Sequence, residues 1–495
     1  MANEMKQAGS QDVKLRRELK PIHVWAIAFG CIIGWGSFIN PGKKFLPASG
    51  VSGTAIAMTL GALIMIIIAF SYAYMVPKYP KAGGEFTFTK ACFGKRAAYL
   101  CGWFLVAAYL TNVPMNSTAL FLIMDGLFGP VLKFGFHYQI AGFDIYMGEM
   151  LFAMAILAIF AYLNIRGVKV AGIVQTILAI TLAVCVFTLM FAAIASPVAT
   201  VSNMEPMWGF DKSTAIADAA AGTYSGVDAY ANSSVATAIL ATLAIAPWAF
   251  VGFDTIPQAA EEFKFSPKKV SFIMIVAILF GAIVYISNNT ITAAALEQWP
   301  DLIVYADSTP WLLLAAAEKM LGTFGKVLVG AGVFSAVLTG MMGFYMASSR
   351  LMFSMARDGY LPKVFAQVDK KHGTPKNAMI FCFVISLSGP ILGREALGWF
   401  VDMSAIGASI GFGFTCMSTL VTMKRFGDGS TFLKVMAVLG AAFSLMFIVL
   451  QLVPIPGLSG VHFCTESYIM LVVWILIGLA FYLYQRKSFL AENAE

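Results

Sequence analysis

Apolar runs long enough to cross a lipid bilayer recur along almost the whole chain, from Trp25 to Tyr484. A helix needs about 20 apolar residues to cross the hydrocarbon core. We count twelve such runs, in a sequence that is 59% hydrophobic and 12% charged, whereas a soluble protein carries roughly 25% charged residues. A surface this apolar requires lipid as its solvent, where backbone groups must pair within helices or closed barrels. The pattern predicts an all-α membrane protein with about twelve transmembrane helices.

The connections between the expected spans differ in charge. Of the 33 Lys and Arg residues, 26, with Arg350 among them, are assigned to connections on the side that carries both termini. Because positive charge concentrates in cytoplasmic loops, we expect a multi-pass protein of the cell inner (cytoplasmic) membrane with both termini in the cytoplasm. The net charge of +7 then reflects contact with anionic membrane lipid, and no nucleic acid partner is expected. The expected spans are 22–48, 51–76, 97–125, 145–164, 168–196, 236–260, 270–296, 324–356, 377–392, 397–423, 431–453 and 466–485.

Sequence signals of several other protein classes are absent. The seven cysteines form no CxxC pair and the four histidines lie far apart, so we expect no metal and no cofactor. A phosphate-binding GxxxxGK[ST] loop is also missing, which argues against direct ATP coupling. We predict that the chain is not an enzyme. The short expected tails, 1–21 and 486–495, argue against a non-transporting amino acid sensor, which we keep as an alternative. The longest expected external segment is 197–235, and we expect a short helix in it.

Two of the expected spans, the first and the sixth, contain helix-breaking residues near their centres. The first has three glycines within residues 30–36, and each costs about 1 kcal/mol relative to alanine in a helix. The sixth has Gly252 between two prolines within residues 247–257. Interrupted helices at matching positions of two repeats indicate a transport site at the repeat interface, whereas close helix packing through small residues is the alternative. The expected divisions are repeat one at 22–196, repeat two at 236–423 and two accessory helices at 431–485.

Unwinding at these two places would expose backbone groups of both kinds. Free amides near Gly36, Ser37 and Phe38 suit a carboxylate, and free carbonyl oxygens at the two breaks suit an ammonium group. The expected ligand is therefore an α-amino acid. Trp35 and Trp248 are large enough to act as lids. The expected substrate-binding residues are Ile32, Ile33, Gly34, Trp35, Gly36, Ser37, Asn112, Asn116, Trp248, Phe250, Val251, Gly252 and Phe253.

One carboxyl group, that of Asp254, is expected in the middle of the sixth span. A charged aspartate there costs roughly 2.5–3.5 kcal/mol on insertion scales, so it needs a partner or a function. Three roles stay open. Asp254 is a candidate proton carrier that couples transport to the proton gradient, a candidate counter-charge for a cationic substrate, or a neutral acid hydrogen-bonded to the backbone freed by the break.

Two further groups of polar residues are candidates for coupling and gating. Ser335 and Thr339 lie one turn apart on the eighth span and, with carbonyls of the first span, form a weak sodium-site candidate. Hydrogen bonds to helix backbone are the alternative. Four charged residues at the cytoplasmic ends of the sixth and eighth spans are candidates for an inner gate, with solvated interfacial charge as the alternative. They are Glu261, Glu262, Arg357 and Asp358.

Four short motifs lie in order between residues 34 and 375. They are GWGSF at 34–38, PKAGGEF at 80–86, FVGFD at 250–254 with AEE at 260–262, and MARDGYLP at 355–362 with TP at 374–375. Together they resemble the amino acid–polyamine–organocation (APC) superfamily of transporters. The resemblance implies a LeuT-like fold of two inverted five-helix repeats plus two accessory helices, in which discontinuous helices one and six bind the α-amino and α-carboxyl groups. The chain departs from the family at Trp35, and span five lacks, near 175–183, the lysine that some relatives use in place of a sodium ion.

We therefore predict a secondary active transporter, a permease that moves an amino acid by alternating access, as a proton symporter or as an exchanging antiporter. The spans contain no clear second charge, so we expect a neutral substrate. A polyamine or a cationic amino acid is the alternative, with Asp254 as its counter-charge. The expected partners are the small-molecule amino acid and membrane lipid, and a homodimer is left open.

Overall fold

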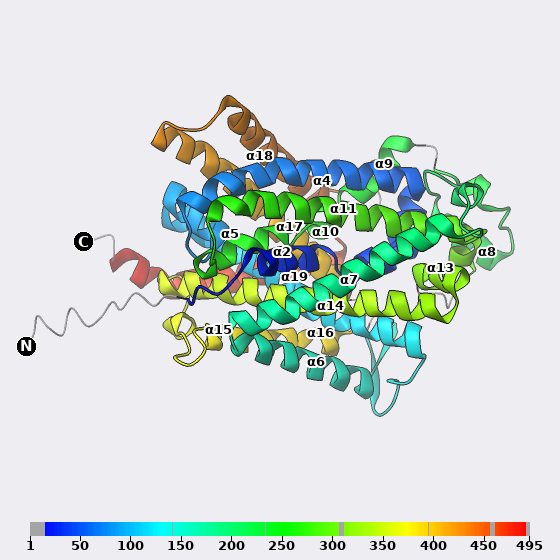
Figure 1. Cartoon of the computed structure of the whole chain (residues 1–495), viewed down its shortest axis with the longest axis horizontal. Coiled ribbons are helices and arrows are strands. Elements are labelled where there is room, and N and C mark those ends of the chain that lie inside the picture. Colours follow the sequence, from blue (N-terminus) through cyan, green and yellow to red (C-terminus); the bar gives the residue numbers. More distant parts are fainter. Residues whose placement is uncertain are drawn as a thin grey trace, which may run out of the picture.

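The computed structural model describes residues 15–140, 142–232, 234–305, 311–394, 396–455 and 461–491, with side chains up to residue 484. Most of its helices run along the long axis of one bundle (Figure 1). The segment after residue 15 and the end of helix α19 (Thr465–Ala491) lie at one end, and helix α8 (Lys212–Ala221) lies at the other (Figure 1). We call the first end the N-terminal face and the second the opposite face. Residues 1–14 and 492–495 of the two predicted tails lie outside the described residues.

The first half of the chain forms five crossing segments, of which the first is broken. Helix α2 (Pro21–Ile32) ends early, and α3 (Gly36–Asn40) follows and continues through a π-helical turn, η1 (Pro41–Phe45), into α4. The chain reverses direction at Gly50, where φ is 62°. The other helices are α4 (Leu46–Lys78), α5 (Gly84–Phe128), α6 (Met147–Ile165) and α7 (Val168–Ala195).

The second half repeats this arrangement, and its first segment is also broken. That segment consists of α9 (Val235–Leu243), α10 (Ala246–Ala249) and a 3-10 helix, η4 (Phe253–Glu262). Nine helical stretches of the described residues are long and apolar enough to cross a membrane; the 58-residue stretch 21–78 provides two crossings. With the broken sixth segment and the shorter α15–α16 pair, twelve crossings result, as predicted. The remaining helices are α11 (Val270–Ala295), α14 (Thr323–Arg357), α15 (Lys376–Ser386), α16 (Ser388–Leu392), α17 (Ala396–Phe426), α18 (Thr431–Leu452) and α19.

The third span differs from its predicted start at residue 97. Helix α5 begins at Gly84, and Gly94, with φ 78° and ψ −169°, bends the chain before the crossing part. A similar bend precedes the crossing helix α14, where Gly322 has φ 60° and ψ −146° after helix α13 (Leu312–Leu321). A residue with a side chain rarely adopts such positive φ values. The same local device thus comes before the third helix of each half.

Short elements cover the opposite face. Within the predicted external segment 197–235 lies α8, which is the expected short helix. A hairpin and the helices α12 and α13 were not predicted, because short polar segments carry no strong periodicity. The small elements of the chain are β1 (His137–Ile140), β2 (Phe143–Tyr146), η2 (Val201–Met204), η3 (Val227–Tyr230), η5 (Pro267–Lys269), α12 (Trp299–Val304) and η6 (Lys363–Ala366).

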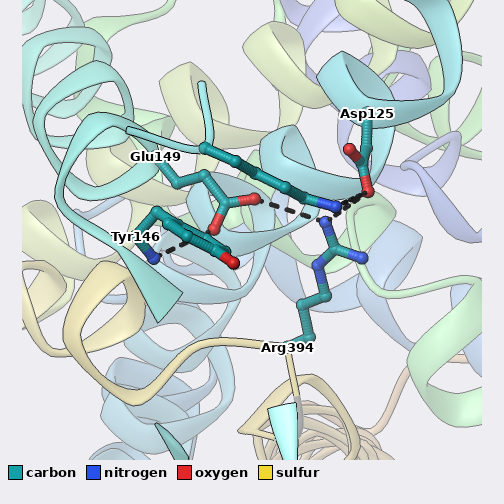
Figure 2. Close-up of polar contacts among 5 residues, drawn as sticks. Asp125, Tyr146, Glu149 and Arg394 are labelled. Atoms are coloured by element: carbon teal, nitrogen blue, oxygen red, sulfur yellow. Dashed lines mark hydrogen bonds and ion pairs between the residues drawn. The ribbon is translucent and has the colours of Figure 1, made fainter. Parts of the chain in front are cut away.

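An ion-pair network ties the hairpin side of the opposite face together (Figure 2). Arg394, just before α17, approaches the Asp125 carboxylate of α5 at 3.0 Å and the Glu149 carboxylate of α6 at 3.3 Å. Glu149 also accepts a hydrogen bond from the backbone amide of Tyr146, and Asp125 pairs with Lys133 at 2.9 Å. Because several charges share these contacts, the network joins the end of α5, the start of α6 and the segment before α17 more firmly than an isolated surface pair would.

Candidate functional site

The first span is interrupted in the middle of the bundle. After α2, Ile33 leaves helical geometry with φ −94° and ψ 82°. Within the part of the chain that the structure describes, the backbone amides of Gly34, Trp35 and Gly36 make no hydrogen bond. The prediction that the amides of Ser37 and Phe38 are free is wrong, because they donate to the carbonyls of Gly34 and Trp35 at 3.2 and 3.0 Å. The free amides therefore begin two residues earlier than predicted, and Gly36 belongs to both sets.

The sixth span is interrupted directly against the first. Helix α10 ends at Ala249, and Gly252 has φ 144° before η4 begins. A Cβ atom at Gly252 would stand 2.7 Å from the Cys31 Cβ and 2.7 Å from the Ile32 amide nitrogen. Only glycine therefore permits this contact between the two backbones.

Free carbonyl groups lie at this contact. Among the described residues, the backbone carbonyl oxygens at four positions of the two breaks accept no hydrogen bond. The carbonyl oxygen of Ile32, by contrast, accepts the Tyr285 hydroxyl at 3.3 Å. Unpaired carbonyls away from water are unfavourable unless a ligand or water meets them. The four positions are Cys31, Ile33, Phe250 and Val251.

Two tryptophans meet beside the break. The rings of Trp35 and Trp248 have centroids 5.8 Å apart, and a Cβ built on Gly36 would collide with the Trp248 ring. Gly34 differs from its neighbours, because it is partly exposed and a Cβ there would have no atom within 4 Å. An open space therefore lies at Gly34, next to the paired tryptophans.

A vestibule of about 790 Å³ opens at the opposite face and reaches Ile245, one turn before Trp248. Its lining includes Lys44, Asp211 and Lys212. Hydrogen bonds from Ser213, and then Thr214, hold the pKa of the Asp211 carboxyl below its usual value. This carboxyl therefore stays charged beside the two lysines at neutral pH.

The predicted side-chain pocket is only partly assembled around the break. Asn112 donates from its amide to Ser404 of α17 at 2.7 Å, and Asn116 packs against Gly340 of α14 with its side-chain oxygen buried and without a partner in the described chain. The aromatic residues diverge. Trp248 faces helix one, Phe250 packs against Tyr285 of α11, and Phe253 stacks on Phe412 of α17 with ring centroids 5.5 Å apart.

Asp254 is completely buried behind the break and belongs to a polar cluster. Its Oδ1 accepts the Gly252 amide at 2.7 Å, and its Oδ2 accepts the Tyr109 hydroxyl at 3.0 Å. The same hydroxyl lies 3.2 Å from Oε1 of Glu85, which is also completely buried. In the sequence, Glu85 was noted only as part of the PKAGGEF motif. Its contact with Tyr109 was not predicted, and it joins α5 to η4.

The predicted gate residues lie together at the N-terminal face, but in three separate pairs. Arg357 contacts Glu261 at 2.6 and 3.1 Å, as the gate hypothesis requires. Glu262 instead pairs with Arg350 at 3.1 and 3.2 Å, and both side chains are fully buried. The sequence analysis had counted Arg350 among loop charges, which is wrong, since it lies inside α14. Asp358 pairs with Lys90 at 2.8 Å.

A strap formed by residues 15–20 crosses the end of η4. The backbone amides of Glu18 and Leu19 both donate to the Glu262 carbonyl, at 3.0 and 2.9 Å, and the Lys264 amide donates to the Leu19 carbonyl. A strap, a buried ion pair and two partly exposed ion pairs thus lie at the N-terminal face. A pocket of about 740 Å³ also opens there, and Lys90, Glu261, Arg357 and Asp358 are part of its lining.

The place considered for a sodium ion is bridged by protein groups. The Thr339 hydroxyl donates to backbone carbonyls, among them those of Gly30 and Ser335 at 3.2 and 2.8 Å. From α7, the Gln175 amide donates to the carbonyl of Ala26 at 3.3 Å and to that of Thr339 at 3.0 Å. An uncharged donor thus joins α2 to α14 there. The sodium role of Ser335 and Thr339 stays a prediction, which these contacts do not favour.

Two broken helices that meet at mid-bundle and leave amides and carbonyls free define a membrane transporter with discontinuous helices. The chain belongs to the amino acid permease family, which it matches over residues 19–481. The predicted superfamily, all-α fold class and amino acid transport function are therefore confirmed.

Proteins similar to this chain carry different substrates in their names. The branched-chain amino acid permease BcaP of Bacillus subtilis is 26% identical over 97% of this chain and 95% of that protein. The methylthioribose transporter of the same organism is 24% identical, over 99% of this chain and 98% of that protein. The vacuolar cationic amino acid transporter 2 of Arabidopsis thaliana is 24% identical, over 83% of this chain and 59% of that protein.

Proposed function

We propose that this permease imports a neutral amino acid with an apolar side chain across the cell inner membrane, and that Asp254 couples import to protons. The observation that carries the proposal is the contact between the two breaks at Gly252. Free amides at 34–36 provide a place for the substrate carboxylate, and the nearby free carbonyls provide one for its ammonium group. A zwitterion satisfies both sets at once.

The preference for a neutral side chain follows from the hydrogen bonds and the burial of Asp254. Both of its carboxylate oxygens are engaged, by the Gly252 amide and the Tyr109 hydroxyl. A cationic side chain at the break would need an accessible carboxylate, because an unpaired buried charge is strongly unfavourable, and Asp254 is completely buried behind the break. The buried tryptophans beside the open space at Gly34 suit an aliphatic group instead. This assignment agrees with the substrate class that the name of the branched-chain amino acid permease of Bacillus subtilis gives.

Alternating access is supported by the difference between the two faces. With the termini in the cytoplasm, the vestibule that reaches Ile245 opens to the outside. The inner pocket is lined by the residues of the Arg357–Glu261 and Lys90–Asp358 pairs, and the strap bonds to the end of η4 beside them. We assign the inner-gate role to the Arg357–Glu261 and Lys90–Asp358 pairs. These pairs are partly exposed and are worth about 0–1 kcal/mol each, so they open readily. Trp35 and Trp248 serve as the outer lid.

Uptake into proteoliposomes tests the proposal. Labelled leucine, arginine, putrescine and methylthioribose are offered separately, and the pH gradient and the sodium gradient are varied independently. We expect accumulation of leucine that follows the pH gradient and ignores sodium. Preferential uptake of arginine or putrescine would assign Asp254 to substrate charge, and preferential uptake of methylthioribose would remove the zwitterion argument. Saturable leucine binding without any counterflow would indicate a sensor.

The variant Asp254→Asn separates coupling from translocation. Asparagine keeps the size of the side chain and one oxygen that can still accept the Gly252 amide, but it takes up no proton. We expect gradient-driven accumulation of leucine to be abolished, while some leucine–leucine exchange remains. Uptake by this variant with the pH dependence of the wild type would exclude Asp254 from coupling.

A further inference from the structure

We propose that Glu85 and Asp254 share one exchangeable proton through the Tyr109 hydroxyl, so that the coupling proton belongs to a pair of carboxyl groups. This inference rests on the proposed proton-coupled transport and adds Glu85 as a second proton-binding residue.

The geometry around the Tyr109 hydroxyl favours such a proton. Besides two carboxylate oxygens, the hydroxyl lies 3.1 Å from the carbonyl oxygen of Asp254. The Tyr109 hydroxyl lies 3.0 Å from Oδ2 of Asp254 and 3.2 Å from Oε1 of Glu85. A phenol has one proton and can donate to only one of them at a time. If both contacts are hydrogen bonds, the second must be donated to the phenol oxygen by a protonated carboxyl. If both carboxyl groups were ionised, the Tyr109 oxygen would face one of the two carboxylate oxygens with no proton between them.

The surroundings of Glu85 supply further donors but no compensating cation. Its Oε1 accepts the Tyr72 hydroxyl at 2.7 Å and its Oε2 accepts the Gln258 amide at 2.5 Å; the same amide lies farther, at 3.4 Å, from the Tyr109 oxygen. Among the described residues, no Lys, Arg or His forms an ion pair with either carboxyl.

Among the described residues, the elements packed against the pair contribute hydroxyl and thiol groups and no cation. These are Tyr72 from α4, Tyr109 and Cys101 from α5, and Cys31 from α2, while the nearby aromatic faces of α14 and α17 carry no charge. Two negative charges in one buried site without a cation repel each other, so such a pair retains a proton.

The pair connects the substrate site to the N-terminal face. Asp254 holds the amide of Gly252, the residue at which the two breaks touch. Glu85 follows Gly83 and Gly84, whose added Cβ atoms would meet Ser354 of α14 and Pro257 of η4. A proton that moves from Asp254 to Glu85 therefore leaves a carboxylate that binds the Gly252 amide more strongly and a neutral acid beside the inner gate.

The proton steps balance without any further reactant. In the outward state, water donates one proton to the pair, and one O–H bond forms on a carboxylate oxygen. Tyr109 relays it by accepting a proton from one carboxyl while giving its own to the other. In the inward state, the O–H bond breaks, the electron pair stays on the carboxylate, and the proton leaves with water. The pair thus carries one proton for each transport cycle.

Three variants of the full-length protein test the pair, with Glu149→Gln as a matched control. Glu149 is another buried glutamate, but it pairs with Arg394 far from the break. We expect Glu85→Gln, like Asp254→Asn, to lose proton-driven leucine accumulation and to retain leucine exchange. Tyr109→Phe keeps both carboxyls but removes the relay, and we expect the pH midpoint of uptake to shift by about one unit. The control should keep the wild-type pH profile.

Infrared difference spectra of the purified protein, recorded across the pH range, give a readout independent of transport. A protonated carboxyl has a C=O stretch that disappears on ionisation. We expect one such band in the wild type, altered in both Glu85→Gln and Asp254→Asn and unchanged in Glu149→Gln. A band that is unaffected by Glu85→Gln would overturn the pair and leave Asp254 as the sole carrier.

The outcomes for the pair and for the proposed function are distinct. If the wild type shows no proton-driven accumulation, the proposed coupling fails. If it does, and Glu85→Gln accumulates leucine with the same pH profile, the proposed function stands and the shared proton does not. A folded Glu85→Gln protein is recognised by its retained exchange, and Tyr109→Phe provides the second measurement if that variant does not fold.

Discussion

Three glycines near the break have different physical reasons to be glycine. Gly252 adopts φ 144° and touches the backbone of helix one. Gly36 is helical, and its missing Cβ leaves room for the Trp248 ring. Gly34 has open space on its side-chain side. Backbone flexibility explains the first, close packing the second and access for a ligand the third.

Gly36→Val tests the residue that separates the two tryptophans. A valine Cβ would collide with the Trp248 ring, and the branched side chain would also cover the free amides. We expect the affinity for leucine to fall at least about tenfold, which is 1.4 kcal/mol. Isothermal titration or scintillation proximity binding on the purified protein measures this. Gly398→Val is the control, because Gly398 is exposed on α17 with no atom near its Cβ position. Wild-type affinity in Gly36→Val would show that the break in helix one serves packing only.

At the scale of elements, α2 and α14 are joined by the side chain of Gln175 from α7. The amide donates to one carbonyl on each helix, which is the linking role that a bound cation would otherwise supply. An uncharged bridge is always present and needs no ion gradient. This arrangement agrees with the absence of a lysine near residues 175–183 of the same helix.

Gln175→Leu removes the bridge with little change in volume. Each lost hydrogen bond contributes about 0.5–1.5 kcal/mol, so we expect a lower melting temperature in detergent and slower uptake. Wild-type uptake should be the same in sodium and in choline buffer. A requirement of the wild type for sodium would contradict the bridging role and would return Ser335 and Thr339 to consideration as ion ligands.

The ion pairs at the N-terminal face differ in burial and therefore in energy. Arg350→Met leaves Glu262 as an unpaired buried charge, which costs about 3–5 kcal/mol. Arg357→Met breaks a partly exposed pair, worth about 0–1 kcal/mol. We expect a large loss of thermal stability from the first variant and a small one from the second, with Arg350→Met/Glu262→Gln in between. Equal melting temperatures of the two single variants would show that Arg350 and Glu262 are not buried together.

At the scale of the whole molecule, the two halves use the same devices on opposite faces. A broken helix opens each half, and a glycine of positive φ precedes the third helix in each, at Gly94 and Gly322. The arrangement brings the two breaks together at one level of the bundle and leaves the described ends of the chain at the same face (Figure 1).

The predicted orientation is testable with a native cysteine. Cys464 is exposed in the connection between α18 and α19, whereas the other six cysteines are buried or partly buried. If the termini are cytoplasmic, this connection is external. A membrane-impermeant maleimide should then label intact cells that express the wild type and should not label those that express Cys464→Ser. Labelling restricted to inside-out vesicles would invert the assigned orientation and, with it, the outer and inner gates.

The twelve crossings, the two breaks and the family could be predicted from the sequence, because hydropathy and helix breaking are local properties. Long apolar runs have few alternatives in lipid, and glycine or proline in such a run interrupts it whatever surrounds it. The place of Asp254 next to the second break followed from the same pattern.

Only the tertiary structure decided which groups meet. The free amides begin at Gly34 rather than at Gly36, since the amides of Ser37 and Phe38 donate to the carbonyls of Gly34 and Trp35. Arg350 is a buried partner of Glu262 and not a loop charge. Tyr109 and Asp254 are 145 residues apart in the chain, and their contact with Glu85 exists because α5 crosses η4. Such contacts depend on how helices pack, and no local pattern in the sequence encodes them.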